Sequence, residues 1–208
     1  MVAAIAPPEI ATQTPHLVVR FRPLFEMTPD EFFEFCSLNP DLNVELTAAG
    51  EVVFMPLSGA ATGARHAAVL AALGQWAMKR KDGVAFDSSA GFALPNTAVR
   101  APDASWVRKS RLAHLTAKQK ERFAPLCPDF VVEVASPSDR LADLQTKMEE
   151  YMANGAQLGW LLAPATRTVY VYRPGEPIVT LENAVSISGD PVLPGFSLEL
   201  GPVWEPEL

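Results

Sequence analysis

The chain has 208 residues, of which 49% are hydrophobic and 20% charged, which is typical of one folded domain and excludes a disordered chain. The formal net charge of −7 argues against a general nucleic-acid-binding protein, because such proteins are often basic. No apolar run approaches the ~20 residues of a membrane helix, and Cys36 and Cys127 form no CxxC zinc motif. Since no basic region precedes the short apolar run at the start, we expect no signal peptide and a cytoplasmic protein.

The first part of the chain is predicted to form an arm and a capped helix. Residues 1–20 are rich in Pro and Ala and lack helical periodicity, so we predict a flexible N-terminal arm there and a single domain at residues 21–208. Thr28 fits a helix N-cap, Pro29 fits the first helical position, and Glu31 completes a capping box. These residues therefore predict a helix that ends before the next proline.

A β-hairpin and a long helix are predicted next. Apolar runs at residues 43–47 and 51–55 flank a turn that ends in Gly50, which is the pattern of a hairpin. Apolar residues then recur with helical spacing over residues 62–81, and the basic residues at the end of this segment suit the negative pole of a helix.

The second half of the chain is predicted to combine short strands with two helices. The run at residues 130–134 is apolar except for one glutamate, which is typical of a central strand covered on both faces. Helices are predicted at residues 116–122 and 139–154, the second ending at Gly155. Further strands are predicted at residues 84–87, 91–94, 103–107, 158–162 and 167–172, followed by one or two edge strands of which the last covers residues 196–200. This order predicts an α/β (α+β) fold, a mixed β-sheet flanked by helices with an N-terminal helix and hairpin.

One segment of this acidic chain is strongly basic. Between residues 100 and 122 only Asp103 and Glu121 oppose the positive side chains. The positive residues are Arg100, Arg108, Lys109, Arg111, Lys118, Lys120 and Arg122. The segment either faces a phosphate backbone or is a solvated basic surface.

Two carboxylates stand at predicted strands. Asp103 follows a proline and opens a strand, where it either caps its own backbone or serves a functional site. Glu133 has only apolar neighbours, and strand alternation places it on the face of Val131, opposite Val132 and Val134. A carboxylate in such a strand must be paired, protonated or bound to a cation, so Glu133 is a candidate functional residue.

The helix after this strand offers a lysine. Asp139, Asp143 and Lys147 recur every fourth residue and share one helix face, while Ser138 or Asp139 is expected to cap the helix start. Lys147 either forms an exposed ion pair with Asp143 or lies over the end of the strand that carries the buried glutamate. Glu45 lies in the predicted hairpin, where its simplest interpretation is an ordinary exposed strand residue.

These motifs resemble a known family, the Uma-type putative restriction endonucleases of the PD-(D/E)XK nuclease superfamily. The resemblance covers roughly residues 25–200, and its most specific signature is a Glu-Val-x-Ser-Pro-Ser-Asp run followed by Lys and Tyr on a helix. The segments that carry it are Val44–Val52, Arg100–Asp103, Pro128–Asp139, Lys147–Tyr151 and Gly155–Leu161.

The resemblance implies a restriction-endonuclease-like core and an endonuclease that hydrolyses phosphodiester bonds of DNA with Mg²⁺ or Mn²⁺. It implies Asp103 and Glu133 as the metal ligands and Glu45 as an accessory acidic residue. In the superfamily a lysine usually stands two residues after the glutamate, where this chain has Ala135. Lys147 is expected to replace it, holding the attacking water or balancing the charge of the transition state.

A second interpretation stays open, which is a catalytically inactive module of the nuclease fold that binds a protein or nucleic-acid partner. The acidic balance and the missing lysine favour this module, whereas the two strand carboxylates favour the enzyme. A homodimer is expected for the enzyme, because cutting both strands of DNA needs two sites and most oligomers are twofold. No membrane partner is expected.

Overall fold

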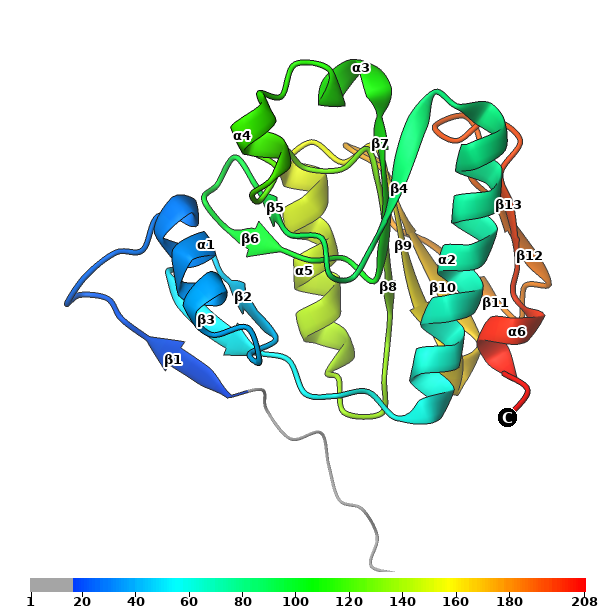
Figure 1. Ribbon diagram of the computed structural model, residues 1–208. Helices are drawn as coiled ribbons and strands as arrows, with labels where there is room; N and C mark the ends of the chain where they lie inside the picture. Colours follow the sequence, from blue (N-terminus) through cyan, green and yellow to red (C-terminus); the bar gives the residue numbers. More distant parts are fainter. Residues whose placement is uncertain (1–16) are drawn as a thin grey trace, which may run out of the picture.

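A six-stranded sheet of order β11-β10-β9-β8-β7-β4 forms the centre of the computed structural model, which describes residues 17–208 (Figure 1). In this sheet β8 and β9 are parallel and the other neighbouring strands are antiparallel, so the sheet is mixed, as predicted. The strands are β4 (Gly83–Asp87), β7 (Ala104–Arg108), β8 (Phe130–Val134), β9 (Leu158–Ala163), β10 (Thr168–Tyr172) and β11 (Val179–Glu182).

A smaller five-stranded antiparallel sheet of order β1-β3-β2-β6-β5 lies beside the large one (Figure 1). Its strands are β1 (Val18–Arg20), β2 (Val44–Leu46), β3 (Glu51–Phe54), β5 (Phe92–Ala93) and β6 (Val99–Arg100). The helix α1 (Pro29–Leu38) packs on it through the buried Phe32, and the predicted capping box between Thr28 and Glu31 is present. The hairpin prediction is confirmed as well, since β2 and β3 pair antiparallel around Gly50, which has a φ of 78°.

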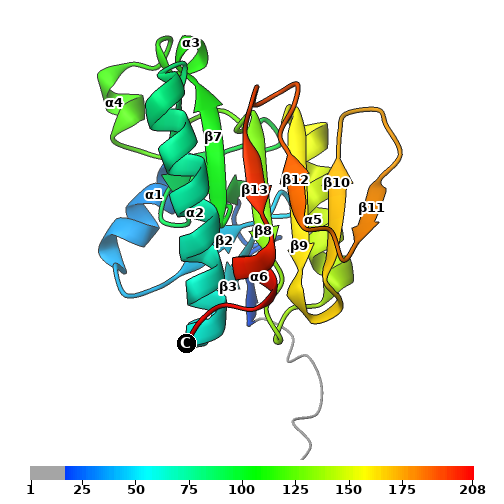
Figure 2. The ribbon, with the colours of Figure 1, turned by 90° about the vertical axis from the view of Figure 1, so that its right-hand side faces the viewer.

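Helices cover both faces of the large sheet. The long helix α2 (Ala60–Arg80) lies on one face together with the two-stranded sheet of β12 (Ser186–Ser188) and β13 (Ser197–Glu199) and the short α6 (Gly201–Trp204) (Figure 2). The helix α5 (Leu141–Ala153) lies on the other face. Within residues 17–208 no helix is long and apolar enough to cross a membrane.

Strand alternation in β8 decides where Glu133 points. Val132 and Val134 pack into the core under α2, whereas Val131 packs into the core under α5. Glu133 shares the face of Val131, so its side chain is directed toward α5, the helix that carries Lys147.

Some predicted elements differ from the structure. Most of the predicted arm, residues 1–16, lies outside the described residues, but Val18–Arg20 is not an arm, because it pairs with β3. The predicted helix 139–154 begins at Leu141, and neither Ser138 nor Asp139 caps it. Asp139 instead accepts a hydrogen bond from the backbone N–H of Ser136, 2.7 Å away, and so closes the preceding turn.

Other elements were too short for sequence patterns to reveal. They are β6, the helix α3 (Lys109–Leu112), α6, and a third strand among β11, β12 and β13, where one or two were predicted. The predicted surface helix near residues 116–122 is present as α4 (Ala117–Lys120).

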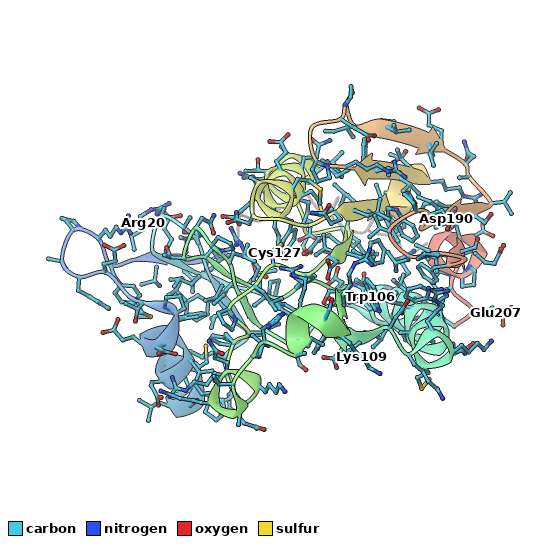
Figure 3. All side chains as sticks on the ribbon, turned by 90° about the horizontal axis from the view of Figure 1, so that it is seen from above. Arg20, Trp106, Lys109, Cys127, Asp190 and Glu207 are labelled. Carbon is cyan, nitrogen blue, oxygen red and sulfur yellow. The ribbon has the colours of Figure 1, made fainter. Side chains whose placement is uncertain are left out.

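The two ends of the large sheet differ in the groups that they carry. Because β7 and β8 are antiparallel, the start of β7 lies beside the end of β8. We call this side of the sheet, which is formed by strand ends and not by an outer strand, the Val134 edge. The start of α2 and the loop into α5 are at this edge, which is the lower one in Figure 1. α3 and α4 are at the opposite edge, which faces the viewer in Figure 3, where Lys109 is labelled.

Candidate active site

Asp103 lies at the Val134 edge, immediately before β7. Its Oδ2 accepts a hydrogen bond from the backbone N–H of Val134 at 2.7 Å, so its position is fixed by the neighbouring strand. The alternative that Asp103 caps its own backbone is therefore wrong. Burial raises the pKa of Asp103 to about 6, although the Val134 N–H and the Lys147 ammonium act in the opposite direction.

Glu133 is buried in β8 with two partners. Its Oε1 lies 2.9 Å from Lys147 Nζ and accepts a hydrogen bond from Tyr151 Oη at 3.0 Å. Burial raises the pKa of Glu133 to about 7, and the negative charges of Asp103 and Glu45 add to this effect against the opposing effect of Lys147. A nearby cation would therefore stabilise the ionised form of Glu133.

Lys147 is buried in α5 and joins two carboxylates. Its Nζ lies 2.9 Å from Oε1 of Glu45 and 2.9 Å from Oε1 of Glu133. The alternative of an exposed ion pair with Asp143 is wrong, because the side chain of Lys147 is only 9% exposed and points to the strands. Burial alone would lower the pKa of Lys147, but Glu133 and Glu45 outweigh it and raise the pKa, so the group stays an ammonium.

Glu45 comes from β2 of the small sheet, and both of its carboxylate oxygens have hydrogen-bond donors as partners. Oε2 accepts from Arg100 Nη1 at 3.0 Å, and Oε1 accepts from the backbone N–H of Ala101 at 2.9 Å in addition to Lys147. Burial would raise the pKa of Glu45, but Lys147 and Arg100 outweigh it and lower the pKa. Glu45 is not the ordinary exposed residue that one alternative assumed; it holds Lys147 in place.

Arg100 extends this network away from the large sheet. Its Nε donates to Glu150 Oε2 at 2.6 Å, and Glu150 Oε1 in turn accepts from Asn96 Nδ2 at 2.9 Å. The guanidinium is buried, with 12% of the side chain exposed. Arg100 is thus used to hold Glu45 and is not presented to a phosphate backbone.

The rest of the basic segment does not border these residues. Arg122 pairs with Asp30 and Glu34 on α1, and Arg108 and Arg111 lie near the carboxylate of Asp129. The remaining lysines are on α3 and α4, at the edge of the sheet opposite Val134 (Figure 1). The sequence prediction that this segment faces a phosphate backbone thus receives no support from its position relative to the candidate site.

His66 is a residue of this region to which sequence reasoning gave no role. It lies in the second turn of α2, and its Nε2 is 3.5 Å from Asp103 Oδ2. Within residues 17–208 this nitrogen has no hydrogen-bond partner, and burial lowers the pKa of His66. Its proximity to the strand motifs was the one signal in the sequence, because its separation of 37 positions from Asp103 matches no ligand spacing.

A small cavity lies between these side chains. It has a volume of about 70 Å³ and is lined by Asp103 before β7, Glu133 of β8 and His66 of α2, and by Ser136 and Ser138 of the loop into α5. Asp103 and Glu133 thus line the same space, with Lys147 in contact with the second of them.

A family model described as Uma2, putative restriction endonuclease, matches residues 29–201. The chain belongs to this family. The fold is also similar to a crystal structure of a putative nuclease belonging to DUF820 from Anabaena variabilis, with a TM-score of 0.70 and 18% sequence identity. The match covers 86% of this chain and 97% of that one, and at this identity it shows the fold alone. The search of curated proteins gave no match.

The donor set of this Uma2 chain suits a hard divalent cation. Within residues 17–208 no group of three or more His, Cys, Asp or Glu side chains is arranged to hold a metal ion. Mg²⁺, however, is commonly held by one or two carboxylates and completes its shell with water and substrate phosphates. Asp103 and Glu133 supply two carboxylates, and burial disfavours the charge on both.

The formal charge of the buried network in this Uma2 chain also favours a divalent cation. Four carboxylates face two cations, which leaves a formal charge of −2 when all are ionised. The members are Asp103, Glu133, Glu45 and Glu150, with Arg100 and Lys147. A divalent cation in the cavity would offset this charge.

The raised pKa of Asp103 predicts a pH-dependent cost. The folded state keeps this proton between about pH 4 and pH 6, where the unfolded chain has released it, so stability falls as the pH rises through this range. Without metal, Asp103→Asn should therefore be more stable than the parent Uma2 chain at pH 8, by roughly 2–3 kcal/mol, with a smaller difference at pH 4. Urea unfolding at both pH values measures it, and a pH-independent difference would contradict the assignment.

Proposed function

We propose that this chain is a Mg²⁺-dependent endonuclease that hydrolyses phosphodiester bonds of DNA. The observation that carries the proposal is the convergence of Asp103 and Glu133 on one cavity beside a buried ammonium. Membership of a family described as putative restriction endonucleases supports the reaction class and DNA as the substrate.

The carboxylates and the ammonium of the site would have different roles. Asp103 and Glu133 would hold the metal, which supplies Lewis acidity toward a phosphoryl oxygen and toward water. Asp103 keeps Oδ1 available, because its Oδ2 already accepts from Val134. Lys147 retains its proton, so it cannot act as a base; its fixed positive charge would stabilise the phosphate charge of the transition state. Glu45 acts by positioning Lys147.

The test is cleavage of supercoiled plasmid DNA by the purified full chain. Cleavage should require Mg²⁺ or Mn²⁺ and stop with a chelator. Asp103→Ala and Glu133→Ala should each abolish it, whereas Glu149→Ala, at an exposed position of the same α5, should retain it. Undiminished cleavage by both carboxylate variants would reject the assignment.

The inactive binding module is the second candidate, and one observation favours it. Lys147 is already shared between Glu45 and Glu133, and Ala135 stands where the superfamily lysine would be. Calorimetric titration with Mg²⁺ or Mn²⁺ distinguishes the two functions. Binding that Asp103→Ala removes supports the enzyme, whereas no binding supports the module. The homodimer and the cytoplasmic location stay predictions.

A further inference from the structure

The cavity at Asp103 and Glu133 is too small for a nucleotide. Its volume of about 70 Å³ is far below the range of about 300–1,000 Å³ that is usual for small-molecule sites. It has room for an ion and a phosphoryl oxygen, so the sugar and base of any substrate must lie outside it.

A larger groove adjoins the cavity. It has a volume of about 490 Å³, within the range of about 300–1,000 Å³ that is usual for small-molecule sites. Met55 and Leu144 line both the groove and the cavity, and Lys147 of the candidate site lines the groove. Apolar walls come from Val18 and Val53 of the small sheet as well as from Met55 and Leu144.

The charges of the groove restrict where a phosphate can bind. Arg100 and Lys147 line it, but both are paired with carboxylates. Arg140 is exposed, and within residues 17–208 it has no ion pair or side-chain hydrogen bond. It follows the loop with Ser136 and Ser138 that lines the cavity, and it also lines the groove. Within residues 17–208, Arg140 is therefore the one cation of the groove without a carboxylate partner, and it directly follows Asp139, which lines the cavity.

The interior of the groove is unsuited to a run of phosphates. Four carboxylates line it against three cations, which leaves a formal charge of −1, so a run of phosphates is disfavoured there. The carboxylates are those of Glu45, Glu51, Asp143 and Glu150, and the cations are Arg100, Arg140 and Lys147. An uncharged group that contacts the apolar side chains fits this interior, whereas a phosphate fits the position of Arg140.

We propose that the groove receives an unpaired nucleobase of the DNA strand being cut, while Arg140 binds a phosphate next to the scissile one. This inference rests on the proposed nuclease function and specifies its substrate class, which is single-stranded or locally opened DNA. A base inside a duplex could not enter the groove without leaving its stack.

The Arg140 contact is tested by the salt dependence of binding. The probe is a short fluorescein-labelled single-stranded oligonucleotide, measured by anisotropy with the full chain in the Asp103→Asn background, which prevents cleavage. Arg140→Ala should lower the slope of log Kd against log salt by about 0.7, as expected for one lost phosphate contact. Arg140→Lys should retain the slope. The matched control is Arg173→Ala, because Arg173 follows β10 at the opposite edge of the sheet.

The base contact is tested by filling the groove. Thr146 is exposed on α5 and lines the groove, so Thr146→Trp should narrow it without disturbing the core. We expect about fivefold weaker binding of the intact oligonucleotide, which corresponds to about 1 kcal/mol at about 1.4 kcal/mol per tenfold change in Kd. An oligonucleotide with an abasic site should bind the parent and this variant equally. Met78→Trp, at an exposed position of α2, is the control.

Each result has a defined meaning. Equal slopes for the Arg140→Ala and Arg173→Ala variants would overturn the phosphate contact, and equal weakening of both oligonucleotides by Thr146→Trp would overturn the base site. Plasmid cleavage that persists alongside such results would retain the nuclease function and reject the groove. Arg140-dependent binding without Mg²⁺-dependent cleavage would retain the groove as a DNA-binding site and reject the nuclease function.

Discussion

Replacing Lys147 by methionine should lower the free energy of unfolding by roughly 3–5 kcal/mol at pH 8. The substitution removes the one ammonium that lies between Glu45 and Glu133, both of which are about 4% exposed. An uncompensated buried carboxylate is costly, whereas the aliphatic part of the side chain is retained by methionine. Urea unfolding followed by tryptophan fluorescence and by circular dichroism measures the effect.

A triple variant controls for the loss of packing. Glu45→Gln and Glu133→Gln added to Lys147→Met replace the ion pairs by neutral groups of similar size, and this should restore most of the lost stability. If Lys147→Met alone changes stability by less than about 1 kcal/mol, the ammonium does not hold this network together.

Glu133→Gln should reduce the rate of Mg²⁺-dependent DNA cleavage at least about a hundredfold without destabilising the protein. A metal held by Asp103 and Glu133 would supply several kcal/mol of transition-state stabilisation, and each ~1.4 kcal/mol is tenfold in rate. The amide can still accept from Tyr151 and avoids the burial cost of the charge that raises the pKa of Glu133 to about 7. The measurement is the initial rate of plasmid nicking.

Its matched control is Glu149→Gln, the same chemical change at an exposed position of α5. This variant should cleave at the parent rate. If Glu133→Gln also cleaves at the parent rate while its unfolding curve shows a folded protein, Glu133 is not a metal ligand.

The face of Glu133 could be predicted from local rules, because an apolar five-residue strand with one glutamate fixes it by alternation. The sequence left two alternatives for Lys147, and the structure places it over the same face. That Asp103 lies near Glu133 followed only from the family resemblance, because a sequence pattern does not give the antiparallel pairing of β7 with β8.

The contacts of Glu45 and His66 in the site depend on packing between elements that are distant in sequence, and hydrophobic periodicity does not predict such packing. The partners of Glu45 follow from how the small sheet docks on α5, and the position of His66 follows from the register of α2 against β7. The two alternatives for the basic segment stayed open for a related reason. The basic composition was clear from the sequence. A sequence pattern does not reveal, however, that Arg100 pairs with two buried carboxylates, or at which edge of the sheet Lys109 lies.

The network joins two sheets that also share a hydrophobic core. Glu45 and Arg100 belong to the small sheet, Glu133 to the large one, and Lys147 connects them. β5 of the small sheet packs in the same buried core as β8 and α5, so loosening of the small sheet would expose that core as well. Loss of activity and loss of structure on warming should therefore share one midpoint.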